Sequence, residues 1–179
     1  MPENKSDNVF LVGPMGSGKT TIGRQIARAL KKKFIDSDHE IEKRTGVDIP
    51  FIFDKEGEDG FRKREHDMIE ELAAHKDIVL ATGGGSVIWP ANRQLLKQNG
   101  VVIYLHAELK ELLKRTARDR NRPLLQTDDP KSKLAKLIQE REDFYREVAD
   151  FVIDTGGRTA KSVVKEILEK IAPEKIPPE

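Results

Sequence analysis

The 179-residue chain contains no cysteine, which excludes disulfide bonds and thiol chemistry and fits a reducing cytosol. No apolar run reaches the length of a transmembrane helix, and the first residues, MPENKSDN, lack the apolar stretch of a signal peptide. The chain also lacks a large excess of positive or negative charge, because it has 32 Lys and Arg and 31 Asp and Glu. No overall field therefore favours nucleic acid or an acidic membrane. We expect a cytoplasmic protein with neither partner, in which any anion binding is local.

The apolar residues predict a single α/β domain with a core over about residues 8–172. Helical patterns separate five short apolar runs that are typical of buried strands, at residues 9–12, 34–36, 78–81, 101–105 and 151–153. This alternation indicates a three-layer α/β/α fold with a parallel sheet covered on both faces. Ligands of such folds bind beyond the carboxyl ends of the strands, so the residues after each run are candidates for a site.

A glycine loop follows the first run, and its spacing from Gly13 to Gly18, Lys19 and Thr20 fits G-x-x-x-x-G-K-[ST]. Backbone N–H groups of such a loop converge on a phosphate, and the following helix adds its partial positive charge. We expect Lys19 to reach the β- and γ-phosphates of a nucleotide and Thr20 to offer its hydroxyl to Mg²⁺. The predicted nucleotide contacts in the loop are Gly13, Met15, Gly16, Ser17, Gly18, Lys19, Thr20 and Thr21.

Asp36 and Asp38 follow the second run and lie two residues apart. If the strand continues through both, their carboxylates point to the same side. One could then hold Mg²⁺ through water, and the other could accept a proton from an attacking hydroxyl. The alternative for Asp38 is a helix N-cap just before Glu40.

Gly83, Gly84 and Gly85 follow the third run. Three glycines allow the backbone to approach a ligand and donate N–H groups to it, although glycine also relieves crowding where a strand leads into a helix. We favour contact with a ligand.

Two arginines are candidates for binding an anion. Arg141 lies on the apolar stripe of the helix predicted around residues 134–148, where its charge needs a carboxylate or an anionic ligand. Arg62 has Glu65 three residues later to orient it, with a plain surface ion pair as the alternative. The forked geometry of two guanidinium groups suits a substrate carboxyl group.

The densest basic stretch contains Arg115, Arg118, Arg120 and Arg122 and leads into Pro123. We interpret residues 115–128 as a mobile lid. An arginine brought in by a lid can stabilise charge on a transferring phosphoryl group. The alternative is a solvated helix end.

Together these residues resemble the shikimate kinase family, of the nucleoside monophosphate kinase structural class. The resemblance covers about residues 9–171 and depends on the motifs GPMGSGKT, DSDHEIEKRTG, GFRKRE, ATGGG, RPLL and EREDFYREVAD, in this order. It implies a P-loop kinase fold with strand order 2-3-1-4-5. It also implies MgATP-dependent phosphorylation of the 3-hydroxyl of shikimate, on the pathway to chorismate and aromatic amino acids.

The resemblance also implies a role for each candidate residue. Residues 36–65 would bind the substrate, and the protein would act as a monomer. Asp38 would bind substrate hydroxyls and is the candidate base. The other implied roles are shikimate binding by Arg62, Arg141, Gly83, Gly84 and Gly85, Mg²⁺ binding by Thr20 and Asp36, adenine contact by Arg115, phosphate contact by Lys19, and contact of Arg122 with both substrate and phosphate.

Three alternatives are weighed against this prediction. A gluconate kinase would share the phosphate loop, but Arg62, the glycine triplet and Arg141 together argue against it. A GTP-binding switch would need an N-K-x-D sequence, which is absent. An inactive scaffold would be expected to have lost Lys19, Asp36 or Asp38. The four histidines have no metal-site spacing, and we assign them no chemistry.

Overall fold

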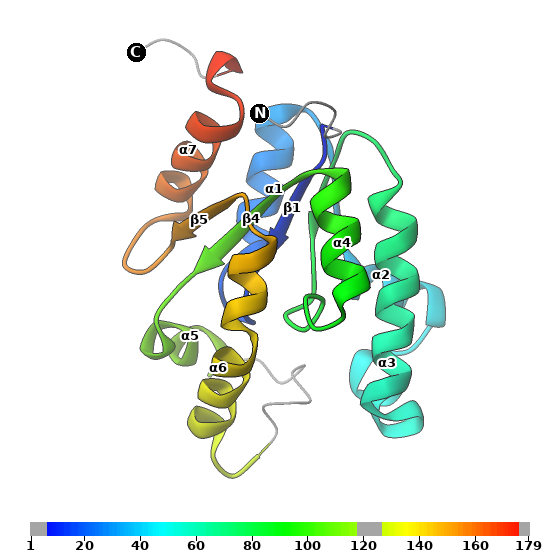
Figure 1. Ribbon diagram of the computed structural model, residues 1–179. Coiled ribbons are helices and arrows are strands. Elements are labelled where there is room, and N and C mark those ends of the chain that lie inside the picture. Colours follow the sequence, from blue (N-terminus) through cyan, green and yellow to red (C-terminus); the bar gives the residue numbers. More distant parts are fainter. Residues whose placement is uncertain (1–6, 118–126, 176–179) are drawn as a thin grey trace.

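A parallel β-sheet forms the middle layer of the protein (Figure 1). The structure is a computed structural model that describes residues 7–117 and 127–175. Within these residues the sheet has five strands in the order β2-β3-β1-β4-β5, as predicted. All four strand pairs are parallel. The strands are β1 (Val9–Val12), β2 (Lys33–Asp36), β3 (Ile78–Ala81), β4 (Val101–His106) and β5 (Phe151–Asp154).

Helices cover both faces of the sheet because its strands are apolar on both sides (Figure 1). Successive residues of β1 point to opposite faces. Val9 and Leu11 pack with α1 (Lys19–Leu30) and α7 (Ala160–Ile171). Phe10 and Val12 pack with α3 (Ile49–Ala73), α4 (Pro90–Asn99) and α6 (Pro130–Val148). The predicted α/β/α layering is therefore confirmed.

Three shorter elements complete the described chain. They are α2 (Ser37–Thr45), α5 (Leu109–Thr116) and the 3₁₀-helix η2 (Pro173–Lys175). The long helix α3 is interrupted at Gly57, which has φ 73° and ψ 179°. This left-handed conformation is accessible to glycine and divides α3 into an entry segment and a segment that carries Arg62. In the part of the chain that the structure describes, no helix is long and apolar enough to cross a membrane.

The strand register brings the segments after β1, β2 and β3 to one edge of the sheet. Leu11 pairs with Ala81, and Ala81 pairs in turn with Asp36. The phosphate loop and the glycine triplet each begin two residues beyond these positions, and the aspartates begin at Asp36 itself. The topology therefore makes neighbours of three segments that are far apart in the sequence.

A buried side chain at the opposite edge joins the beginnings of β1 and β3. The Nδ2 of Asn8 donates to the carbonyl of His75 (2.7 Å), and its Oδ1 accepts from the N–H of Ile78 (3.1 Å). We expect Asn8→Ala to lower the free energy of unfolding by about 3 kcal/mol, because it leaves buried backbone groups without these partners. Urea denaturation measures the change.

The matched control is Asn99→Ala. The amide of Asn99 donates to the Leu95 carbonyl of its own helix, and the side chain is partly exposed. Its loss should cost under about 1 kcal/mol. Equal losses for the two variants would contradict the role given to Asn8.

Candidate functional site

The loop between β1 and α1 has the features of a phosphate cradle. Gly18 is the N-cap of α1 with φ 98°, and no side chain caps the helix. Across the described residues, the N–H groups of Gly16 and Gly18 donate to no acceptor. Lys19 bends back over the loop and donates to the carbonyls of Gly13 (2.6 Å) and Pro14 (2.9 Å). The N–H groups, the ammonium and the helix N-terminus together suit a phosphate.

Asp36 connects this loop to α2. Its Oδ2 accepts from the hydroxyl of Thr20 (2.9 Å), and its Oδ1 accepts from the N–H of His39 (3.1 Å). Asp36 is therefore the N-cap of α2, and the interpretation of Asp38 as the cap is wrong. The assumption that the strand continues to Asp38 is also wrong, because β2 ends at Asp36 and α2 begins at Ser37.

Asp38 nevertheless lies against the glycine triplet from the first turn of α2. A Cβ at Gly83 would lie 2.8 Å from Asp38 Oδ1 and 2.9 Å from Glu65 Oε2. At these distances a Cβ would force the two carboxylates to shift. The N–H of Gly83 donates to Ser37 Oγ (3.2 Å). Two carboxylates from different helices thus converge on the backbone of Gly83.

Arg62 packs on the third glycine. A Cβ at Gly85 would overlap both Nη atoms of Arg62, whose side chain is only 6% exposed. The guanidinium donates to Glu65 Oε1 (3.0 Å), which is buried, and to Glu58 Oε1 (3.3 Å), which is half exposed. The predicted orienting role of Glu65 is confirmed, and the alternative of a plain surface pair is wrong. Burial raises the pKa of Glu65, and Arg62 and Arg141 oppose that rise.

Arg141 is buried on α6, as the apolar stripe predicts. Over the ranges described, no carboxylate forms an ion pair with its guanidinium, although its charge acts on the pKa of Glu65 and Tyr145. A Cβ at Gly84 would lie 3.7 Å from Arg141 Nη1. The predicted contact of this buried charge with a carboxylate or an anionic ligand stays a prediction.

A cavity of about 380 Å³ joins the phosphate loop to the aspartates and the glycine triplet. It is lined by predicted site residues from all three segments: Gly16, Gly18, Lys19, Thr20, Thr21, Asp36, Asp38, Gly83 and Gly84. Arg62 and Arg141 are outside this lining, and their contacts with Gly85 and Gly84 connect them to it. Arg141 instead lines a neighbouring cavity of about 180 Å³ with Glu58 and Lys133. The structure thus places the candidate residues in two adjoining groups.

The cavity also has lining residues that the sequence analysis did not single out. They are His39 and Glu42 on α2, Ile49 and Pro50 at the start of α3, and Thr82. A signal for the start of α3 is present in the sequence, because Asp48 before Pro50 is a good N-cap and accepts from the N–H of Phe51 (2.9 Å).

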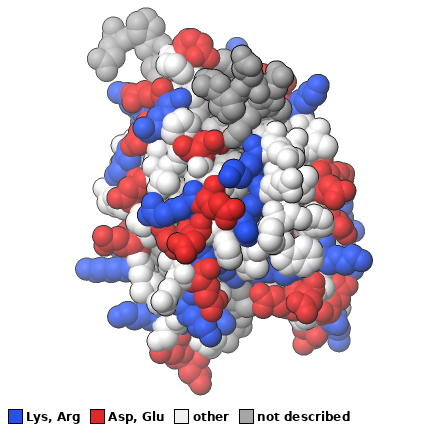
Figure 2. Space-filling view, viewed as in Figure 1, with Lys and Arg blue, Asp and Glu red and all other residues white. Residues whose placement is uncertain are grey.

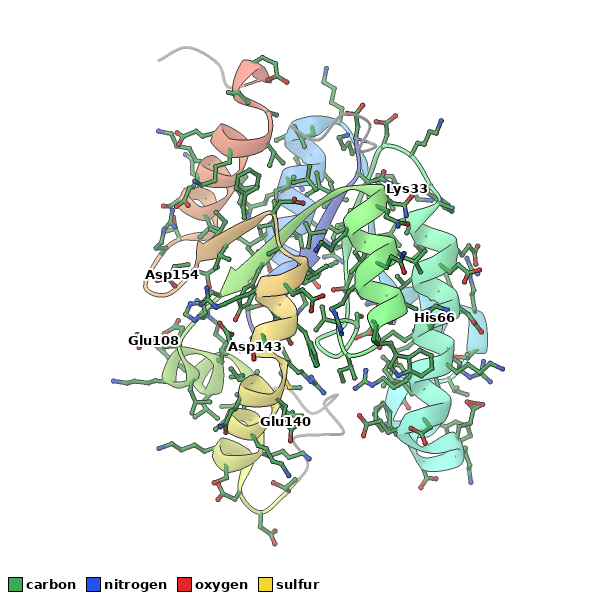
Figure 3. All side chains as sticks on the ribbon, viewed as in Figure 1. Lys33, His66, Glu108, Glu140, Asp143 and Asp154 are labelled. Atoms are coloured by element: carbon green, nitrogen blue, oxygen red, sulfur yellow. The ribbon has the colours of Figure 1, made fainter. Side chains whose placement is uncertain are left out.

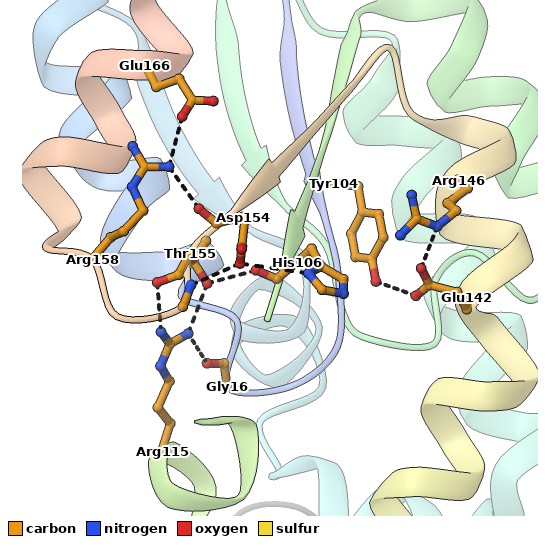
Figure 4. A network of polar contacts seen from close by, with 11 residues as sticks. Gly16, Tyr104, His106, Arg115, Glu142, Arg146, Asp154, Thr155, Arg158 and Glu166 are labelled. Carbon is orange, nitrogen blue, oxygen red and sulfur yellow. Dashed lines mark hydrogen bonds and ion pairs between the residues drawn. The ribbon is translucent and has the colours of Figure 1, made fainter. Parts of the chain in front are cut away.

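Arg115 holds two loops together (Figure 4). It donates to the carbonyl of Gly16 (3.1 Å) and to both Oγ1 and the carbonyl of Thr155 (3.2 Å each), and it pairs with Glu111. The phosphate loop is thereby tied to the segment after β5. The predicted adenine contact of Arg115 stays a prediction. Arg122 and residues 118–126 of the expected lid lie outside the described residues.

Outside the candidate site, charges of both signs are mixed on the surface (Figure 2) and His66 has a polar partner. Basic and acidic side chains are interspersed on the face seen in Figure 2, in keeping with the near-zero net charge. His66, labelled in Figure 3, contacts Asn92 Oδ1 through Nδ1 (2.6 Å) and lies beside Trp89. Among the residues described, no group of three or more His, Asp or Glu could hold a metal ion.

The chain is similar in sequence and in structure to proteins of one family. The family model described as shikimate kinase matches residues 15–172. A shikimate kinase of Pseudomonas syringae pv. syringae is 56% identical over 171 residues, which cover 96% of this chain and 98% of the relative. The solved structure of a shikimate kinase from Acinetobacter baumannii in complex with shikimate is 49% identical with a TM-score of 0.92, covering 98% of this chain and 97% of that chain.

A more distant structure shares the fold alone. A gluconokinase from Sinorhizobium meliloti covers 97% of this chain and is itself covered to 95%, with a TM-score of 0.63 and 19% identity.

The two carboxylates on Arg62 provide a test of how the site is held together. We expect Glu65→Ala to lower the free energy of unfolding by about 3 kcal/mol, because it leaves a buried guanidinium without its buried partner. Glu58→Ala removes the half-exposed partner of the same arginine and should cost less than about 1 kcal/mol. Chemical denaturation of both variants measures the difference. Equal costs would show that Glu65 does not anchor Arg62.

Proposed function

The chain belongs to the shikimate kinase family, and from this premise we propose that it transfers the γ-phosphoryl group of ATP to the 3-hydroxyl of shikimate. The product is shikimate 3-phosphate, on the pathway to chorismate and aromatic amino acids. One observation carries the proposal: a single cavity is lined both by the phosphate loop and by Asp38, Gly83 and Gly84. A donor and an acceptor bound in it would meet with little water between them.

The phosphate loop would bind the triphosphate of ATP. Exchange of the Gly13 and Pro14 carbonyls for phosphate oxygens would give Lys19 a stronger, charged partner. Thr20 and Asp36 supply a hydroxyl and a carboxylate oxygen 2.9 Å apart, a donor set that fits Mg²⁺. When bound, Mg²⁺ neutralises charge on the phosphate oxygens.

The acceptor end would bind shikimate through groups of different chemistry. Arg62 and Arg141 provide two buried cations for the carboxylate. The N–H groups of Gly84 and Gly85 donate to no acceptor in the described chain and offer hydrogen bonds to the ligand. Asp38 would hold the ring hydroxyls and accept the proton of the attacking one.

The rest of the proposal concerns segments around this cavity. Residues 36–65 would form the substrate-binding region, and residues 115–128 a lid whose Arg122 contacts both phosphate and substrate. Arg115 would contact adenine from its place beside Thr155. A single chain carries all of these groups, which supports function as a monomer.

The identity of the acceptor is tested directly. ADP release is measured with the enzyme, MgATP and, separately, shikimate, gluconate or a nucleoside monophosphate. Of the three acceptors, we expect only shikimate to raise ADP release above the background measured with MgATP and no acceptor. If ADP release rose with gluconate and not with shikimate, gluconate and not shikimate would be the acceptor.

The role of Asp38 is tested by Asp38→Asn, which keeps the size of the side chain and removes its charge. We expect kcat to fall by about 100-fold or more while the KM for ATP stays within about twofold, because the base acts on the acceptor. The control is Asp48→Asn, at an exposed N-cap where asparagine serves equally well. An unchanged kcat for Asp38→Asn would remove Asp38 from the chemistry.

A further inference from the structure

A tyrosine outside the predicted site holds the middle glycine of the triplet. Tyr145 lies on α6, one helical turn after Arg141, and is 1% exposed. Its hydroxyl donates to the carbonyl of Gly84 across 2.6 Å. The contact spans 61 residues of sequence and joins α6 to the segment after β3. Gly84 lines the cavity in which donor and acceptor would meet.

The phenol is suited to a permanent donor role. Burial raises the pKa of Tyr145 to about 12, and the positive charge of Arg141 partly opposes the rise. The hydroxyl therefore keeps its proton at any pH at which the protein is expected to work. The hydrogen bond from Tyr145 to the Gly84 carbonyl is therefore not lost by ionisation of the phenol in that pH range.

Holding the Gly84 carbonyl also fixes a donor on the next residue. A trans peptide is planar, so its C=O and N–H point in opposite directions, and the described chain has no cis peptide. The N–H on this peptide belongs to Gly85 and has no acceptor within the ranges that the structure covers. Glycines have few intrinsic conformational restraints, so the orientation of this N–H depends on such outside contacts.

The same helix face carries the buried cation beside the triplet. Residues one turn apart on a helix lie above one another, so Arg141 and Tyr145 face the triplet together. The guanidinium of Arg141 lies next to Gly84, and the hydroxyl of Tyr145 donates to the Gly84 carbonyl. Any shift of α6 relative to Gly84 would change both contacts at once.

From these contacts we propose that Tyr145 is a positioning residue for shikimate. Its hydroxyl fixes the Gly84–Gly85 peptide so that the peptide N–H and the Arg141 guanidinium meet the acceptor in one defined arrangement. The inference rests on the proposed function, because it assigns Tyr145 to the acceptor half of that site. Tyr145 acts through Gly84, and within the described residues its hydroxyl forms no hydrogen bond with the phosphate loop.

The chain offers a matched control in Tyr104 of β4. The two rings stack with centroids 4.9 Å apart and an interplanar angle of 28°, and both side chains are buried. The hydroxyl of Tyr104, however, donates to Glu142, which also pairs with Arg146 (Figure 4). We expect removal of either hydroxyl to leave the two rings stacked. Only the removal of the Tyr145 hydroxyl takes away the hydrogen bond to Gly84.

The experiment compares Tyr145→Phe with Tyr104→Phe in steady-state assays at varied shikimate and varied ATP. We expect Tyr145→Phe to raise the KM for shikimate about tenfold and to leave the KM for ATP within about twofold. Tyr104→Phe should leave both KM values within about twofold, and thermal unfolding confirms that both variants are folded. A second measurement uses the wild-type protein: the ¹⁵N–¹H resonance of Gly85 should shift when shikimate is added.

Several results would overturn the proposal. They are an unchanged KM for shikimate in Tyr145→Phe, an equal rise of both KM values, the same rise in Tyr104→Phe, or a Gly85 resonance that does not respond to shikimate. If Tyr145→Phe does not fold, the Gly85 resonance alone decides. Failure of the proposed function would look different, because the wild-type enzyme itself would then show no turnover with shikimate.

Discussion

The candidate acceptor site depends on a short backbone that carries no side chains. Each residue of the triplet after β3 has a different neighbour where a Cβ would be: Asp38 and Glu65 at Gly83, Arg141 near Gly84, and the guanidinium of Arg62 at Gly85. A Cβ at Gly83 or Gly85 would force the side chains of α2 and α3 to shift, whereas Arg141 of α6 lies 3.7 Å from a Cβ at Gly84, which is an ordinary contact. The triplet is therefore the point at which three helices meet the end of the sheet, and their polar groups gather there.

The phosphate side and the acceptor side share structural parts. Asp36 caps α2 with one carboxylate oxygen and binds Thr20 of α1 with the other. The helix that presents Asp38 is thus fixed to the helix that follows the phosphate loop. Arg115 fixes the phosphate loop in a second way, by joining Gly16 to Thr155 after β5. An enzyme that brings two substrates together needs such links, because an error of about 1 Å in their relative position is costly to the rate.

The sequence predicts the local features of this protein well. Buried parallel strands are continuous apolar runs, so all five strands were found, and the glycine spacing located the phosphate loop. Asp38 lines the cavity beside the phosphate loop, but it does so from the first turn of α2 and not from a continued strand, because β2 ends at Asp36 and Asp36 caps α2. The hydrogen bonds from Tyr145 to the carbonyl of Gly84 and from Arg115 to the carbonyl of Gly16 could not be predicted. These contacts join residues far apart in the chain, and their geometry depends on how α5 and α6 pack on the sheet.

We propose that shikimate binds against the glycine triplet, between Asp38 on the cavity side and the guanidinium groups of Arg62 and Arg141, which lie beside the triplet but outside the cavity lining. A crystal structure of this protein with shikimate and ADP tests it most directly. We expect the carboxylate of shikimate within hydrogen-bonding distance of Arg62 and Arg141, and a ring hydroxyl within the same distance of Asp38 on the side facing the phosphate loop. Shikimate bound with its carboxylate away from both arginines, or outside the cavity lined by Asp38 and Gly84, would contradict the account.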